Sequence, residues 1–273
     1  MLCDYHIHSN FSDDSSYLME DIVKDAIKKA LKEICFTDHV DYGIKIDQHH
    51  LDHDIKDGEL YNVHYPNYKK EYDRLKEKYA HQITLKFGLE FGMQVHTIDQ
   101  FQKLFKQYPF DFILLSCHQV NNLEFWNQDF QKGKTVDEYH QAYYLEILEV
   151  IQNYQDYSVL AHLDLIERYD EKKYPFEKVK PIVVDILKKV IADGKGIEVN
   201  TSSARYGLND LTPSKEILKL YQDMGGKIIT IGSDSHEPSH LGEGIQKTRN
   251  LLKEIGFEYY CTYEKMQPIF HEL

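Results

Sequence analysis

The chain has 273 residues, of which 42% are hydrophobic, and it carries a formal net charge of -13 at pH 7. This length and composition fit one folded domain, residues 1–273, and exclude a disordered chain. The negative charge argues against nucleic acid as a partner, because no cluster of basic residues opposes it; Lys69–Lys70 and Lys188–Lys189 stand among acidic residues.

Cysteine content and hydropathy bear on the compartment. The four cysteines are widely spaced and include no CxxC pair, so neither a disulfide framework nor a thiolate metal site is expected. No stretch approaches the roughly 20 apolar residues of a membrane span, and no signal peptide precedes the first apolar run. We therefore expect a cytoplasmic protein without a membrane partner, and the oligomeric state stays open.

Short apolar runs alternate with amphipathic segments along the chain. The strand-like runs are 2–8, 33–38, 83–90, 112–118, 158–162, 196–201 and 227–233. The helix-like segments, with apolar residues at helical spacing, are 19–32, 139–154, 176–192, 214–224 and 241–255. Such alternation predicts parallel strands joined by crossover helices, and seven strands favour a closed or nearly closed barrel.

Residues 40–67 interrupt this rhythm and predict a long loop over one end of the barrel. The segment contains several acidic residues, among them Asp41 and Asp47, and a histidine cluster, His49, His50 and His53, that is more typical of a solvated loop than of a metal site. Long ordered loops of this kind often serve as lids over active sites.

Histidine and acidic residues lie at or just after the ends of most predicted strands. His6 and His8 alternate along the first strand, so their side chains share one face. The other members of the set are Asp14, His39, Glu90, His118, His162, Asp234 and His236. Because the carboxyl ends of barrel strands meet at one rim, we expect these side chains to converge there.

A convergence of imidazoles and carboxylates predicts a metal site, since without a cation it would leave buried charges unpaired. Nitrogen and oxygen ligands without cysteine suit Zn²⁺, Mn²⁺ or Fe. Cys117 precedes His118 on its strand and is expected to face the core. The sequence contains no HExxH, GxxxxGK[ST] or GxGxxG motif, so a zinc-protease helix and nucleotide-cradling loops are excluded.

Taken in order, these motifs resemble the polymerase-and-histidinol-phosphatase (PHP) superfamily. They are Asp4-Tyr5-His6-Ile7-His8-Ser9, Phe36-Thr37-Asp38-His39, Gly88-Leu89-Glu90, Ser116-Cys117-His118, Ala161-His162 and Gly232-Ser233-Asp234-Ser235-His236. The resemblance implies an α/β fold, a distorted (β/α)7 TIM-like barrel, with three divalent metal ions.

The resemblance also implies how the ligands are shared. His6, His8, Glu90 and Asp234 would hold the first ion, and Glu90 would bridge to a second ion held by His118 and His162. The third ion would be held by Asp14, His39 and His236, where some relatives carry histidine in place of Asp14. Asp13 is the alternative to Asp14 if that assignment is off by one residue.

Within the superfamily the chain is similar to the phosphatases that hydrolyse L-histidinol phosphate in histidine biosynthesis. The features that carry this likeness include Phe11-Ser12, the long second loop and Asn200-Thr201-Ser202-Ser203-Ala204-Arg205. Arg168 and Arg205 are candidate phosphate ligands, because a guanidinium can grip phosphate through paired N–H groups, and Asn200 is a further candidate substrate contact.

The mechanism expected from this pattern is attack on phosphorus by a hydroxide that bridges two metals, with Glu90, Asp234 and His236 as the catalytic residues. Asp234, His236 and the acidic loop are alternative sources of assistance to the leaving alkoxide. A small-molecule phosphomonoester is the expected partner. The alternatives are a nuclease or phosphatase of other specificity and a metal-binding module without catalytic activity.

Overall fold

The computed structural model describes residues 1–48 and 59–273 and contains a parallel sheet that closes on itself. Seven strands follow one another around this sheet in the order β1 (Cys3–Asp4), β2 (Glu33–Phe36), β4 (Thr84–Gly92), β5 (Phe112–Ser116), β8 (Val159–Leu160), β9 (Gly196–Asn200) and β10 (Ile229–Gly232). An eighth, β3 (His39–Val40), pairs with the end of β4.

The first and last strands of this order lie side by side. The amide of Tyr5 donates to the carbonyl oxygen of Ile231 at 3.1 Å, and Ile7 forms a parallel bridge with Ser235. All strand pairs of the sheet are parallel. The predicted barrel of seven parallel strands, nearly closed, is therefore confirmed.

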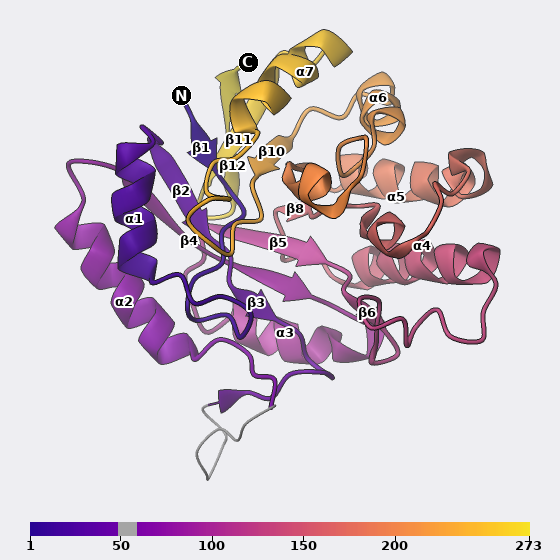
Figure 1. The fold of residues 1–273 in the computed structure, drawn as a ribbon, viewed down its shortest axis with the longest axis horizontal. Helices are drawn as coiled ribbons and strands as arrows, with labels where there is room; N and C mark the ends of the chain where they lie inside the picture. Colours follow the sequence, from indigo (N-terminus) through magenta and orange to yellow (C-terminus); the bar gives the residue numbers. More distant parts are fainter. Residues whose placement is uncertain (49–58) are drawn as a thin grey trace.

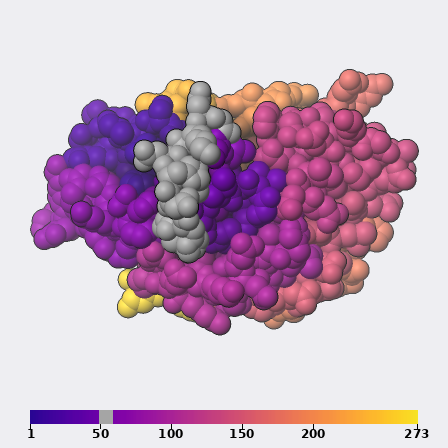
Figure 2. Space-filling model, turned by 90° about the horizontal axis from the view of Figure 1, so that it is seen from below, coloured from indigo at the N-terminus to yellow at the C-terminus, as the bar shows by residue number. Residues whose placement is uncertain are grey.

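The α-helices lie outside the sheet (Figure 1). They are α1 (Met19–Lys28), α2 (Tyr65–Lys78), α3 (Ile98–Phe105), α4 (Val136–Asn153), α5 (Lys180–Ala192), α6 (Lys215–Asp223) and α7 (Ile245–Ile255). Figure 2 shows that the face below the view of Figure 1 is formed mostly by the amino-terminal half of the chain. None of the helices in residues 1–48 and 59–273 is both long and apolar enough to cross a membrane.

Two helices illustrate what the apolar pattern captures and what it misses. Helix α4 begins with a capping box in which Thr135 and Glu138 satisfy each other's backbone amides. Helix α2 was not predicted, because tyrosines such as Tyr65, Tyr68 and Tyr72 form most of its buried face. A tyrosine stripe buries a large apolar area, although each ring also needs a partner for its hydroxyl group.

The carboxyl-terminal hairpin, β11 (Tyr259–Glu264) and β12 (Gln267–Glu272), packs across the amino end of the barrel. Tyr263 and Tyr5 both pack against Phe112, with ring centroids 5.0 Å apart in each pair, and all three side chains are buried. The Tyr5 hydroxyl donates to Glu33 and accepts from the Tyr263 amide at 2.7 Å. This aromatic cluster, the Tyr5–Phe112–Tyr263 plug, fills the end of the barrel opposite the predicted site.

The predicted loop 40–67 is shorter than expected, because α2 begins at Tyr65. Its described part is organised by Asn62, which is fully buried. The Asn62 side chain accepts from the amide of Asp41 at 2.8 Å and donates to Asp47 at 2.8 Å. The histidines of the predicted solvated cluster, His49, His50 and His53, lie outside the described residues.

A short hairpin and 3₁₀ helices connect the strands and helices of the barrel. The hairpin, β6 (Gln119–Val120) and β7 (Leu123–Glu124), follows β5. The described residues also contain the 3₁₀ helices η2 (Val95–Thr97), η3 (Leu165–Tyr169), η4 (Phe176–Lys178) and η5 (Ser202–Tyr206), of which η3 and η5 follow β8 and β9. The β6–β7 hairpin, η3 and η5 form part of the wall of the pocket above the strand ends.

Candidate metal centre

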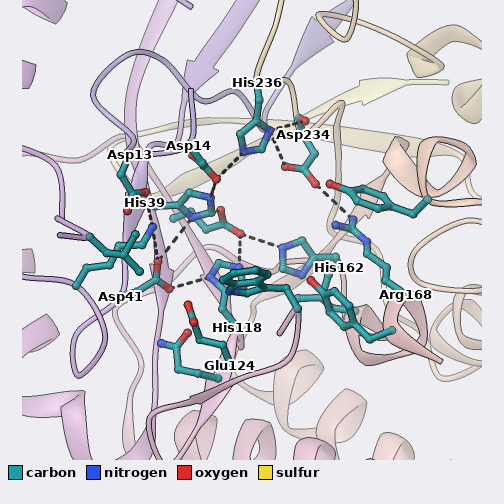
Figure 3. A pocket seen from close by; sticks show the side chains of 18 residues that line it. Asp13, Asp14, His39, Asp41, His118, Glu124, His162, Arg168, Asp234 and His236 are labelled. Carbon is teal, nitrogen blue, oxygen red and sulfur yellow. Dashed lines mark hydrogen bonds and ion pairs between the residues drawn. The ribbon is translucent and has the colours of Figure 1, made fainter. Parts of the chain in front are cut away.

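The predicted ligands converge on one pocket at the carboxyl ends of the strands, with a volume of about 360 Å³ (Figure 3). Seven of the nine predicted ligands line it: Asp14, His39, Glu90, His118, His162, Asp234 and His236. The other two, His6 and His8, are fully buried beneath them on the segment that follows β1. A pocket of this size is within the range of small-molecule sites, roughly 300–1,000 Å³.

Glu90, near the end of β4, lies at the centre of the cluster and is fully buried. Its Oε1 lies 2.9 Å from His162 Nε2 and 3.2 Å from His118 Nε2. Its Oε2 lies 3.2 Å from His6 Nε2 and 3.0 Å from His39 Nδ1. The two oxygens of one carboxylate thus face two different groups of imidazoles, which is the arrangement a bridging ligand requires.

Asp234 and Asp14 each face two imidazoles of the cluster. Asp234 Oδ1 lies 3.5 Å from the Nε2 atoms of both His6 and His8. Asp14 Oδ2 lies 3.3 Å from the Nε2 atoms of both His39 and His236. Asp234 has a left-handed backbone, with φ of +55°, a strained conformation that is typical of functional sites.

Several imidazoles use their second ring nitrogen to contact an acceptor that is not one of the proposed ligand atoms. His6 Nδ1 lies 2.6 Å from Glu198 Oε1, and His118 Nδ1 lies 2.8 Å from Asp41 Oδ1. His236 Nδ1 lies 3.1 Å from the carbonyl oxygen of Asp234. Such partners fix the ring and leave Nε2 free to bind a metal, as in metal-ligating histidines generally.

Burial and neighbouring charges determine how the cluster ionises. Burial would raise the pKa of Glu90, but the imidazoles of His6, His118 and His39 reverse this and hold the pKa well below its usual range. Burial, reinforced by His236 and His39, holds the pKa of His8 well below its usual value, so that ring is neutral. Burial would also lower the pKa of His6, His39 and His118, but neighbouring carboxylates overcome it and raise the pKa of all three rings. Divalent cations bind ionised carboxylates and neutral imidazoles, so a bound metal would displace the protons from these rings.

The donor set fits divalent metal ions. In the described part of the chain, the buried nitrogens His8 Nε2 and His39 Nδ1 have no hydrogen-bond partner, although each lies within 3.5 Å of Glu90 Oε2. Among residues 1–48 and 59–273, four groups each place three or four ligand atoms within 4.8 Å of one another: His8, Asp14, His39 and His236; His6, His8 and Glu90; His39, Glu90 and His118; and His6, His162 and Glu198. Oxygen and imidazole donors of this kind suit Zn²⁺, Mn²⁺ and Fe.

The predicted substrate contacts lie in different places. Arg168 on η3 lines the pocket, with its NH2 3.4 Å from Asp234 Oδ2 and its guanidinium 4.3 Å from the centre of the Tyr206 ring. Arg205, against expectation, does not line it: its guanidinium donates to the carbonyl oxygens of Ser233 and Asp234 and pairs with Glu243.

Asn200 is also displaced from its predicted role. It is fully buried and is not among the residues that line the pocket. Its Oδ1 accepts from the amide of Ser202 at 2.9 Å and lies 3.5 Å from Arg168 NH2. The Asn200 side chain therefore contacts Arg168 rather than the pocket. Its oxygen already accepts a hydrogen bond from the turn after β9.

Three residues around the cluster were not assigned there from the sequence. Glu198 contacts His6, Asp41 contacts His118, and Lys45 pairs with Asp41 at 3.1 Å. The alternation Glu198-Val199-Asn200 on β9 was the available signal, since a carboxylate inside an apolar strand needs a buried partner. Asp41 was seen only as part of an acidic loop.

A parallel barrel with imidazoles and carboxylates gathered at its carboxyl ends defines a divalent-metal-binding barrel of the hydrolase type. Residues 4–202 match the model of the PHP domain, and the chain belongs to this family. The chain is 31% identical to the histidinol-phosphatase of Lactococcus lactis over 268 residues, which cover 97% of this chain and 95% of that protein.

Two solved structures are similar throughout. One is the Lactococcus lactis histidinol phosphate phosphatase complexed with zinc, L-histidinol and phosphate, with a TM-score of 0.85, 30% identity and 98% coverage of both chains. The other, from Listeria monocytogenes, has a TM-score of 0.74 at 20% identity, covers 90% of this chain and 99% of that chain, and supports the fold alone.

Proposed function

We propose that this protein is a metal-dependent phosphatase that hydrolyses L-histidinol phosphate to L-histidinol and phosphate. The observation that carries the proposal is the position of Glu90, whose two carboxylate oxygens face separate groups of imidazoles at the base of a pocket. The likeness to a histidinol-phosphatase along almost the whole chain supports the choice of substrate.

We further propose that three divalent ions occupy the cluster, with the ligands shared as the family pattern implies. Glu90 would lie between the first ion, with His6, His8 and Asp234, and the second, with His118 and His162. The third would be held by Asp14, His39 and His236. When bound, divalent ions acidify a coordinated water and offset negative charge on phosphate oxygens.

The chain's own groups would bind and orient the phosphate. The Arg168 guanidinium is held by Ser202 Oγ at 2.7 Å and by the face of Tyr206, so its position is fixed before substrate arrives. Arg168 also lines the pocket. A fixed guanidinium at the pocket wall is suited to a phosphate oxygen that enters the pocket.

The pocket wall supports an aromatic, positively charged leaving alcohol. Trp126, Tyr169 and Tyr206 supply aromatic surface, and Glu124 supplies a carboxylate on the same pocket. Aromatic faces and a carboxylate are the groups that attract a cationic imidazole or an ammonium group. Asp234 and His236 line the same pocket and remain the proposed catalytic groups for the departing alkoxide.

The competing functions make different predictions in one assay. Purified protein of known metal content is given histidinol phosphate, p-nitrophenyl phosphate and a dinucleotide diester in parallel. We expect kcat/KM for histidinol phosphate to exceed that for p-nitrophenyl phosphate at least 100-fold, with no diester cleavage. Comparable rates on both monoesters would indicate a general phosphatase, diester cleavage a nuclease, and no turnover with metal bound a non-catalytic module.

The compartment and the domain organisation are proposed on separate grounds. The four cysteines are buried and unpaired, which supports a reducing compartment such as the cytoplasm. One core cluster includes residues from Cys3 to Tyr263, which supports a single domain over residues 1–273.

A further inference from the structure

A buried lysine links two carboxylates at the edge of the proposed metal centre. Lys45 Nζ lies 2.8 Å from Asp13 Oδ1 and 3.1 Å from Asp41 Oδ2. The side chains of all three residues are at most 10% exposed. A lysine in this position has lost much of its hydration, and its ion pairs with the two carboxylates must offset that cost.

Each carboxylate of this triad leads to a different part of the ligand cluster (Figure 3). Asp41 accepts from His118 Nδ1 at 2.8 Å and so orients the ring whose Nε2 faces Glu90. Asp13 precedes Asp14, whose Oδ2 faces His39 and His236. Lys45 therefore links Asp41, which orients His118, to Asp13, which is adjacent to Asp14 in the chain.

The backbone around Lys45 is fixed by hydrogen bonds. The Lys45 amide donates to the Asp41 carbonyl oxygen at 2.9 Å, so both ends of the pair share one turn. Asn62 accepts from the Asp41 amide at 2.8 Å and donates to the Lys45 carbonyl oxygen at 3.5 Å. The ammonium group thus has a defined position between the two carboxylates.

We propose that Lys45 is a positioning residue of the metal centre, which fixes His118 and Asp14 relative to each other. This inference rests on the proposed metal centre and adds a role for the loop that carries Lys45. Two effects of removing Lys45 have opposite signs. Loss of a positive charge would strengthen cation binding, whereas loss of the link would weaken it.

The test measures zinc binding to metal-stripped protein by competition with a chromophoric chelator. The variants are Lys45→Met, Lys45→Gln and Lys45→Arg. The matched control is Lys189→Met, which removes a lysine of helix α5 that pairs with Asp193 just after the helix. We expect Lys45→Met to weaken zinc binding about 10- to 100-fold, the range for partners of ligating residues, and Lys189→Met to leave it unchanged. Lys45→Arg should restore most of the affinity.

Tighter or unchanged zinc binding in Lys45→Met would overturn the proposal, because Lys45 would then only balance charge. If Lys45→Met does not fold, as judged by its melting transition, Lys45→Gln gives the same reading, since it removes the charge but leaves a polar side chain beside the two carboxylates. Zinc affinity is measured without substrate, so a protein that binds zinc but does not hydrolyse histidinol phosphate would contradict the proposed function and leave this test intact.

Discussion

Glu198 Oε1 lies 2.6 Å from His6 Nδ1, on the side of the imidazole that faces away from Glu90. Glu198 also accepts from the amide of His162 at 3.0 Å, so one buried carboxylate supports two proposed ligands. We expect Glu198→Ala to lower metal affinity about 10- to 100-fold, since the His6 ring loses the partner that fixes its tautomer and orientation.

Metal content after dialysis at fixed free Zn²⁺ checks this prediction, with Glu149→Gln on the exposed face of α4 as the control. Glu198→Gln should fall between the control and Glu198→Ala, because an amide keeps the shape but not the charge. Full metal occupancy in Glu198→Ala would mean that His6 is oriented by the strand alone.

Gly92, the last residue of β4, faces the Asp41–His118 pair. A Cβ at this position would overlap Asp41 Oδ1 and lie 2.8 Å from His118 Nδ1. We expect Gly92→Ala to displace Asp41, to weaken metal binding and to lower kcat/KM by at least 10-fold. Parallel measurement of the melting temperature of the metal-free protein separates this local effect from unfolding, and unchanged metal binding would contradict it.

Arg168 and Arg205 provide a matched pair for the phosphate contact. Arg168→Met should lower kcat/KM for the phosphomonoester about 10- to 100-fold, since a hydrogen bond to a charged group contributes about 1.5–3 kcal/mol. Most of the change should be in KM, with metal content retained. Arg205→Met should have the smaller effect, because the guanidinium of Arg205 contacts backbone carbonyl groups and Glu243. A larger loss of kcat/KM in Arg205→Met than in Arg168→Met would instead assign the phosphate contact to Arg205.

Removal of metal should reduce stability as well as activity. An ion present at about 1,000 times its dissociation constant stabilises the folded state by about 4 kcal/mol, which corresponds to roughly 10 °C in melting temperature for a chain of this size. We expect chelation to abolish turnover and lower the melting temperature by this order. Separate addition of Zn²⁺, Mn²⁺ and Fe²⁺ then identifies which ion restores both, and metal analysis of the restored protein tests the proposed three ions.

Glu167 predicts a pH dependence of stability. Burial, with a contribution from Asp170, raises the pKa of Glu167 from 4.5 to about 7, although Lys173 opposes the shift. The folded state therefore holds the proton more tightly, and the associated stability is lost as pH rises from about 4.5 to about 7. Glu167→Gln should melt with the wild type near pH 4.5 and at a higher temperature at pH 8. An equal difference at both pH values would contradict this.

The barrel could be predicted because each strand is marked by its own short run of apolar residues. All seven predicted strand segments contain an observed strand, and the proposed ligands stand next to the strand ends, where a one-residue error changes little. Helix α2 was missed because its buried face consists mostly of tyrosines, whose ring is apolar and whose hydroxyl group is polar, so the helical apolar pattern is weak. The pairing of β3 with β4, which brings His39 level with Glu90, involves only two residues and leaves no periodic signal.

The contacts around the ligands could not be predicted, because they depend on how loops turn in space. Arg205 lies close to a predicted strand end, but the 3₁₀ helix η5 and the left-handed turn at Gly207 determine where its guanidinium goes. Lys45 meets Asp13, 32 positions earlier in the chain, only because the loop folds back around Asn62. Sequence spacing identifies which side chains reach the rim, whereas their partners follow from tertiary packing.

The Tyr5–Phe112–Tyr263 plug closes the end of the barrel opposite the pocket, so entry and exit share one mouth. In the proposed reaction the phosphate lies deepest, against the ligand cluster, and the alcohol lies nearer the opening. The alcohol must therefore leave first and phosphate last. In kinetic terms, inorganic phosphate should inhibit competitively with substrate, whereas the alcohol product should inhibit noncompetitively.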